Sequence, residues 1–145
     1  ALALTRSPVC LAAGAEELGG CRGEMENALA RHGLERRFRI VSGPLGGMLS
    51  GCLGVLAFEE TCFAPLAAEA QGFGKTVIEV RRSPGCLEWM HETGWIVTPE
   101  EESIAAALDR IYKDPARARG MGARAPQIMT ELGMNWEAVA ARLIA

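Results

Sequence analysis

Short apolar runs alternate with helical patterns through the first part of the chain. Apolar residues bounded by glycine, proline or serine predict strands, and apolar positions three or four residues apart predict helices. The helical patterns cover residues 24–32 and 65–71, with Pro65 in the first turn of the second. Strands are expected at residues 9–13, 38–41, 55–58, 76–80 and 94–97.

From residue 98 onward the pattern is helical only. Residues 98–101, Thr-Pro-Glu-Glu, form a capping box with proline at the first helical position, which predicts a helix over residues 99–113. Asp114 followed by Pro115 repeats the signal for a second helix, and Asn135 caps a third. The first of these helices is expected to turn three residues inward: Ile104, Leu108 and Ile111.

This order of elements predicts an α/β fold, a single Rossmann-like, doubly wound parallel sheet flanked by helices, with a helical C-terminal tail. Residues 45–52 are rich in glycine and give no clear element. Residues 1–8 are too few to hold a strand and its helix ahead of the first predicted strand. We therefore expect residues 1–145 to be one domain that lacks its first strand.

Composition fits a globular protein and excludes several classes of function. Hydrophobic residues make up 49% and charged residues 23%, with a net charge of −3 and a basic run limited to Arg36, Arg37 and Arg39, so nucleic-acid binding is not expected. The five cysteines are an odd number without a C-x-x-C pair, which argues against a disulfide framework and a zinc site. No apolar run reaches the length of a membrane span, and we expect a cytoplasmic protein.

The candidate chemistry lies between residues 55 and 98. In open parallel sheets, ligands bind at the carboxyl ends of the strands, and Glu59, Glu60, Glu69 and Glu88 follow or flank such ends. The free amides before the helix at Pro65 would attract an anion such as a phosphate. Glu69 could accept hydrogen bonds from ribose hydroxyls, or it could be an ordinary acid near a helix N-terminus; the spacing leaves both readings open.

Several separate motifs carry a resemblance to a known family. They are C-F-A-P-L-A-A-E-A-Q-G-F-G-K-T-V-I, P-G-C-L-E, H-E-T-G-W-I-V-T-P, D-P-A-R-A-R-G-M-G and N-W-E-A-V-A. They lie in this order between residues 62 and 140. The resemblance covers roughly residues 8–144, and it is to the C-terminal, donor-binding domain of the retaining GT-B glycosyltransferases of the group 1 family, which includes bacterial mannosyl- and glucosyltransferases.

The resemblance implies roles for named residues. The family has two glutamates separated by seven residues, the first on the donor sugar and the second on the ribose, and Glu69 matches the second. Thr61 stands at the first position, with Glu60 directly before it, so these two are the tentative catalytic residues. A hydroxyl is a weaker partner than a charged acceptor, which puts donor choice and activity in question. The implied donor-binding residues are Phe63, Ala64, Pro65 and Leu66 before and in the helix, Gly85 and Glu88 in a G-x-x-E turn, and Ser42 and Gly43 near the base.

The implied activity is transfer of a hexose from a nucleoside-diphosphate sugar, such as GDP-mannose or UDP-glucose, to an acceptor hydroxyl with retention of configuration. No cofactor and no metal are expected. The family's Arg and Lys that neutralise the diphosphate belong to the absent first strand, so we expect residues 1–145 alone to be inactive. An N-terminal domain outside these residues would hold a sugar or lipid acceptor and make any membrane contact, at the inner face of the membrane, in cell-envelope or polysaccharide synthesis.

Two other classes stay open at this stage. One is a degenerate, non-catalytic nucleotide-binding or scaffold module of the same fold, which Thr61 and the absent first strand would favour. The other is a GT-B relative with different chemistry, such as a sugar-nucleotide epimerase, against which the E-A-Q-G-F-G-K and H-E-T-G motifs argue.

Overall fold

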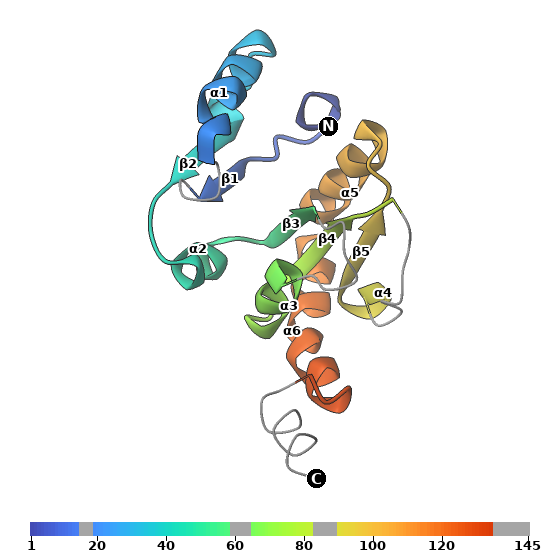
Figure 1. Cartoon of the computed structure of the whole chain (residues 1–145). Coiled ribbons are helices and arrows are strands. Elements are labelled where there is room, and N and C mark those ends of the chain that lie inside the picture. Colours follow the sequence, from blue (N-terminus) through green and yellow to red (C-terminus); the bar gives the residue numbers. More distant parts are fainter. Residues whose placement is uncertain (15–18, 59–64, 83–89, 135–145) are drawn as a thin grey trace.

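The computed structural model describes residues 1–14, 19–58, 65–82 and 90–134 and confirms an α/β fold (Figure 1). Every predicted strand is present, although the first begins two residues later than predicted. Apolar runs between turn residues were thus a sufficient signal for strands. The strands are β1 (Leu11–Gly14), β2 (Phe38–Val41), β3 (Gly54–Phe58), β4 (Thr76–Val80) and β5 (Gly94–Val97).

The helices predicted at residues 24–32, at Pro65, over residues 99–113 and after Pro115 are confirmed, although the third begins at Glu101, and two further helices were not predicted. The glycine-rich segment 45–52 forms α2, because Leu49 is buried against the core and tertiary packing outweighs the low helix propensity of glycine. The predicted helix at Asn135 lies outside the described residues. The helices are α1 (Arg22–Arg31), α2 (Leu45–Gly51), α3 (Pro65–Gly72), α4 (Met90–Thr93), α5 (Glu101–Lys113) and α6 (Pro115–Glu131), with short 3-10 turns η1 (Leu2–Leu4), η2 (Gly19–Cys21) and η3 (Glu35–Arg37).

The strands form two parallel sheets instead of one continuous sheet. β1 pairs with β2, and a second sheet has the order β3-β4-β5. Figure 1 shows β1 and β2 beside α1, apart from the three-stranded sheet and running in a different direction from β3. The sequence pattern alone identifies strands but does not state which edges are joined, and here no described strand bridges β1 and β3.

The core lies on both faces of β4, whose five residues are all buried. Val77 packs with α2 and α3 on one face, while Ile78 packs with α5 and α6 on the other. Burial on both faces is typical of a central parallel strand. The three residues predicted to face inward from α5, Ile104, Leu108 and Ile111, are buried as expected.

The two helices after β5 begin differently. The capping box predicted at residues 98–101 is wrong, because α5 starts at Glu101 and Glu100 has extended backbone angles. Thr98 Oγ1 donates to Ser103 Oγ, and the Glu101 carboxylate lies 3.4 Å from the Ala1 ammonium. The cap at Asp114 is confirmed, since its Oδ1 accepts the Arg117 amide at 2.9 Å.

The N-terminal segment is tied to α5 by a buried carboxylate. Asp109 accepts the backbone N–H groups of Arg6 at 3.0 Å and Ser7 at 2.9 Å. The Arg6 amide, with a smaller contribution from the Ser7 amide, holds the pKa of Asp109 below its usual value. The carboxylate form is therefore the form that stabilises the fold.

We expect Asp109→Asn to lower the thermal midpoint at neutral pH. The pKa of Asp109 is lower in the folded protein than in the unfolded chain, so the stabilisation is present above the unfolded pKa of about 3.9 and disappears as pH falls through the folded pKa. Thermal melts from pH 7 to pH 2.5 should show the two proteins converging at the acid end. A constant difference over this range would contradict the role of the charge.

Candidate functional site at the carboxyl ends of the strands

The carboxyl ends of β3, β4 and β5 lie along one edge of the three-stranded sheet (Figure 1). Crossover connections in a parallel sheet return from this edge, so α3 also begins on the same side. The described groups on this side include Phe58 at the end of β3, Arg81 and Arg82 after β4, and the first turn of α3. A ligand crevice in an open parallel sheet is expected at this edge.

Six of the predicted site residues lie outside the described residues, in the segments 59–64 and 83–89 that follow β3 and β4: Glu60, Thr61, Phe63, Ala64, Gly85 and Glu88. Their roles stay predictions. The structure describes the backbone of Pro65 and describes Leu66, Glu69, Ser42 and Gly43 in full.

Helix α3 begins at the residue that the sequence pattern predicts. Pro65 is the first residue of the helix. Backbone N–H groups in the first turn have no partner within the helix, so a proline, which has no N–H, costs no hydrogen bond there. Ala67 and Ala70 are buried against the sheet, and Leu66 packs at the edge of the same cluster. Packing fixes the direction of the helix and therefore of its N-terminal amides, including that of Leu66.

The polar residues after Glu69 hold α3 to the rest of the fold. Gln71 is fully buried, and its Nε2 donates to Thr93 Oγ1 at 2.7 Å. Thr76 Oγ1 donates to the Thr93 carbonyl at 3.0 Å, which joins β4 to the start of β5. Gln71 Nε2 and Thr76 Oγ1 therefore hold α3 and β4 to the start of β5.

The end of α3 is closed by a glycine and a lysine. Gly74 has φ +69° and donates to the Gln71 carbonyl, while the Lys75 amide donates to the Ala70 carbonyl, which is a Schellman motif. The Lys75 ammonium donates to the carbonyls of Ser50 at 3.2 Å and Cys52 at 3.1 Å. Lys75 thus ties the end of α2 to the turn between α3 and β4.

Replacing Lys75 by methionine is expected to lower the free energy of unfolding by about 0.5–1.5 kcal/mol, since the last carbonyls of α2 lose their charged donor. Urea denaturation measures this difference. Lys113→Met is the matched control, because Lys113 is exposed at the end of α5. Equal losses in both variants would contradict the tie to α2.

Glu69 stands out because nothing described in the fold uses its carboxylate. Its side chain is exposed, on the fifth residue of α3, and none of the ion pairs among the described residues includes it. Within the run E-A-Q-G-F-G-K, the neighbouring Ala70, Gln71, Gly74 and Lys75 all have structural tasks. Glu69 is the described carboxylate near the start of α3 that is free to meet a ligand.

An ion pair at the end of β4 was not predicted. Glu79 and Arg81 are both buried and form a salt bridge on one face of the strand, while Arg82 is exposed. Two residues apart on a strand share a face, so the pattern E-V-R was the available signal. The pair places charged groups at the carboxyl end of the central strand, next to the candidate site.

Ser42 and Gly43 are not brought to this edge. They follow β2, whose carboxyl end lies on the opposite side of the molecule from the ends of β3, β4 and β5 (Figure 1). The cause is the separation of the two sheets. Gly43 has φ +144°, an angle that favours glycine, and a Cβ there would meet nothing within 4 Å.

Among residues 1–14, 19–58, 65–82 and 90–134, no group of three or more histidine, cysteine, aspartate or glutamate side chains is placed to hold a metal ion. Of the helices in these ranges, none has the length and apolar character needed to cross a bilayer.

Comparison with solved structures gives close matches in fold. HepE from Anabaena in complex with UDP-glucose matches with a TM-score of 0.73 at 19% identity, over 99% of this chain and 43% of that one. The same protein in complex with UDP matches over 90% of this chain with a TM-score of 0.73. Sucrose-phosphate synthase from Thermosynechococcus elongatus matches with a TM-score of 0.70 at 27% identity, over 92% of this chain and 36% of that one.

These neighbours are GT-B glycosyltransferases, so the fold class predicted from the sequence is confirmed. This chain spans about two fifths of the length of each neighbour. No protein-family model and no curated protein matches the chain.

Proposed function

We propose that this chain is the donor-binding domain of a retaining glycosyltransferase that moves a hexose from a nucleoside-diphosphate sugar to an acceptor hydroxyl. The observation that carries the proposal is Glu69, an exposed carboxylate without a structural task among the described residues. By resemblance it matches the family's ribose-binding glutamate. The fold likeness to HepE, solved with UDP and with UDP-glucose, supports the class of ligand.

In the proposed mechanism the first turn of α3 faces the diphosphate. Unpaired amides at a helix N-terminus favour negative charge, and that charge grows on the diphosphate as it leaves. The bond between the anomeric carbon and the diphosphate oxygen breaks, and a bond to the acceptor oxygen forms on the same face of the sugar. The leaving diphosphate takes the proton of the acceptor hydroxyl. Glu60 or Thr61 would contact the sugar, and Phe63, Ala64, Gly85 and Glu88 would complete the donor site.

The rest of the proposed enzyme lies outside residues 1–145. The acceptor, a sugar or a lipid, would bind a second domain, and the cleft between the domains would exclude water from the reactive sugar. Residues 1–145 alone would bind the donor and not transfer the sugar. We place the protein in the cytoplasm, with any contact to the inner face of the membrane made by the second domain.

Calorimetric titration with UDP-, GDP- and ADP-sugars tests the proposal. Binding of one nucleotide class by the chain, strengthened in a longer polypeptide with the upstream sequence, is the expected result. Absence of binding to all three in both forms would refute it. The second candidate is a non-catalytic nucleotide-binding module, which the threonine at position 61 favours; binding without sugar transfer by the longer polypeptide would establish that reading.

A further inference from the structure

The described residues form two units that share few contacts. The small unit consists of β1, η2, α1, η3 and β2, and the large unit consists of η1 and the elements from α2 to α6. No residue of α1 or β2 is buried, and Leu11 of β1 is the described side chain of the small unit that packs on the core beneath α5.

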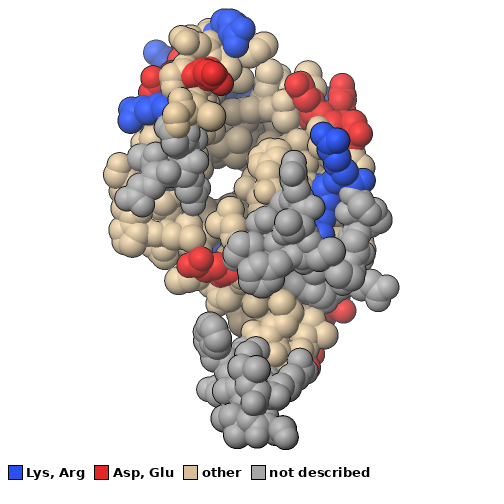
Figure 2. Space-filling view, viewed as in Figure 1, with Lys and Arg blue, Asp and Glu red and all other residues tan. Residues whose placement is uncertain are grey.

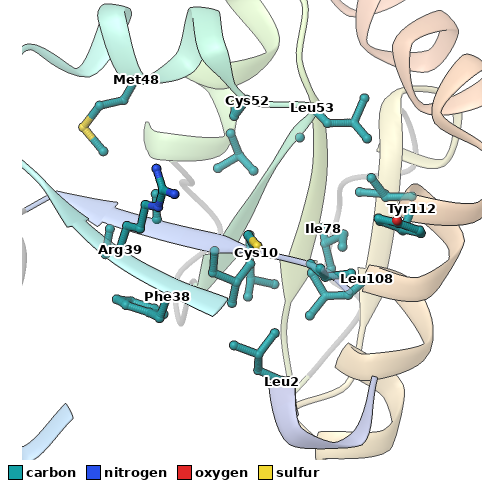
Figure 3. Close-up of a pocket in the computed structure, with 18 of the residues that line it drawn as sticks. Leu2, Cys10, Phe38, Arg39, Met48, Cys52, Leu53, Ile78, Leu108 and Tyr112 are labelled. Atoms are coloured by element: carbon teal, nitrogen blue, oxygen red, sulfur yellow. The ribbon is translucent and has the colours of Figure 1, made fainter. Parts of the chain in front are cut away.

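An apolar cavity of about 990 Å³ lies between the two units. Figure 2 shows an opening through the molecule in this region. Figure 3 shows Phe38 and Arg39 of β2 across the cavity from Leu108 and Tyr112 of α5. Because a cavity takes the place of an interdigitated interface, close packing does not fix the position of the small unit.

Two short stretches of chain connect the units, and the second of them is loosely held. Residues 5–10 lead from η1 into β1, and residues 42–44 lead from β2 into α2. Neither Ser42 nor Gly43 forms a hydrogen bond with another described residue. Gly43 has φ +144°, and a Cβ there would meet nothing within 4 Å. A glycine with this freedom can absorb changes in φ and ψ, as hinge residues do.

The first connection, residues 5–9, is held from both sides by charged groups. Arg37 of η3 grips it from the small unit, since its Nε donates to the Val9 carbonyl at 2.9 Å and its Nη2 donates to the Ser7 carbonyl at 2.9 Å. Asp109 of α5 holds it from the large unit, by accepting the amides of Arg6 and Ser7. The Ser7 backbone is therefore bonded to one unit by its carbonyl and to the other by its amide.

These bonds are well suited to carry the connection between the units. Hydrogen bonds with an ionised partner are about twice as strong as those between neutral groups. Ser7 is 7% exposed, so water has little access to compete for its backbone groups. The Arg37 guanidinium reaches two carbonyls of the same segment, which fixes the direction of the segment as well as its distance from η3.

We propose that Arg37, residues 5–9 and Asp109 form a clamp that fixes the small unit against the large unit, with Gly43 as the pivot. Loss of either charged group lets the small unit turn about Gly43 as a rigid body. The turn separates Leu11 from the core and widens the cavity, but it breaks no pairing between β1 and β2, because both strands belong to the small unit. Nucleotide binding is not needed for this clamp.

Residual dipolar couplings of the backbone amides, measured by nuclear magnetic resonance in a weakly aligning medium, test the clamp. In the unmodified chain one alignment should fit the couplings of both units. In Arg37→Gln and in Asp109→Asn, the couplings of the small unit should need a separate alignment and shrink at least about twofold, since motion averages them. The double variant should match the single variants, because either loss alone opens the clamp.

Arg36→Gln is the matched control. Arg36 is the exposed neighbour of Arg37 on η3, so this variant loses the same charge and should keep one alignment. One alignment in both Arg37→Gln and Asp109→Asn would overturn the clamp, as would separate alignments in the unmodified chain or in Arg36→Gln. Signals of an unfolded small unit in either clamp variant would also overturn it, because the unit would then not move as a rigid body.

Discussion

Replacing Glu69 by alanine is expected to weaken the binding of the donor nucleotide by about 10- to 100-fold. Hydrogen bonds from neutral hydroxyls to a charged carboxylate contribute about 1.5–3 kcal/mol. The exposed side chain of Glu69 makes no ion pair among the described residues. The affinity of Glu69→Gln should lie between those of the unmodified chain and Glu69→Ala, because glutamine keeps the shape of the side chain and loses its charge. Isothermal titration with the nucleotide sugar that binds best measures the three affinities.

Glu102→Ala is the matched control for this experiment. Glu102 is also an exposed glutamate near a helix N-terminus, on α5. Thermal melts should show that all variants keep the fold, since the Glu69 side chain is not buried. Unchanged affinity in Glu69→Ala would remove the ribose role and leave Glu69 as an acid favoured by the helix dipole.

Replacing Gly122 by alanine is expected to lower the free energy of unfolding by about 3 kcal/mol, the upper end of the range for overpacking. Gly122 of α6 faces the turn between α3 and β4, where a Cβ would lie 2.4 Å from the Gly74 carbonyl oxygen and 2.6 Å from the Thr76 nitrogen. Both neighbours are backbone atoms, so α6 itself must move away from the sheet. Guanidinium denaturation measures the change.

Gly120→Ala provides a control two residues away in the same helix. A Cβ at Gly120 meets nothing within 4 Å, so this variant should gain about 0.5–1 kcal/mol from the higher helix propensity of alanine. The opposite signs separate close packing from propensity. A loss of stability in Gly120→Ala equal to that in Gly122→Ala would contradict the packing of α6 on this turn.

Local signals in the sequence were enough for most elements. Each strand is an apolar run between turn residues, and the Asp114-Pro115 cap formed as expected because its partner, the Arg117 amide, is three residues away. The capping box at residues 98–101 did not form. The Thr98 hydroxyl donates to Ser103, and the Glu101 carboxylate pairs with the N-terminal ammonium, a contact that depends on the tertiary fold. Helix α2 was not predicted for a similar reason, since Leu49 is held by distant core residues.

The candidate site was predictable in its position along the chain and less so in its assembly. Spacing placed Glu69 one turn into a helix but left its role open; the structure adds that the carboxylate is exposed while Gln71 and Lys75 are engaged. The buried pair of Glu79 and Arg81 was overlooked, because the strand pattern alone treats charged residues as solvent-facing. Which sheet edges are joined depends on pairing between distant strands, which no local pattern contains.

Under the proposed function, a nucleotide binds at the start of α3 and the carboxyl ends of β3 to β5. Nuclear magnetic resonance of the labelled chain during titration with UDP, with GDP and with glucose alone tests it most directly. One nucleotide, and not glucose, should shift the amide signals of Leu66 to Glu69 and of Val80 to Arg82 while leaving α1 unchanged. Shifts confined to α1, or none with either nucleotide, would contradict the claim.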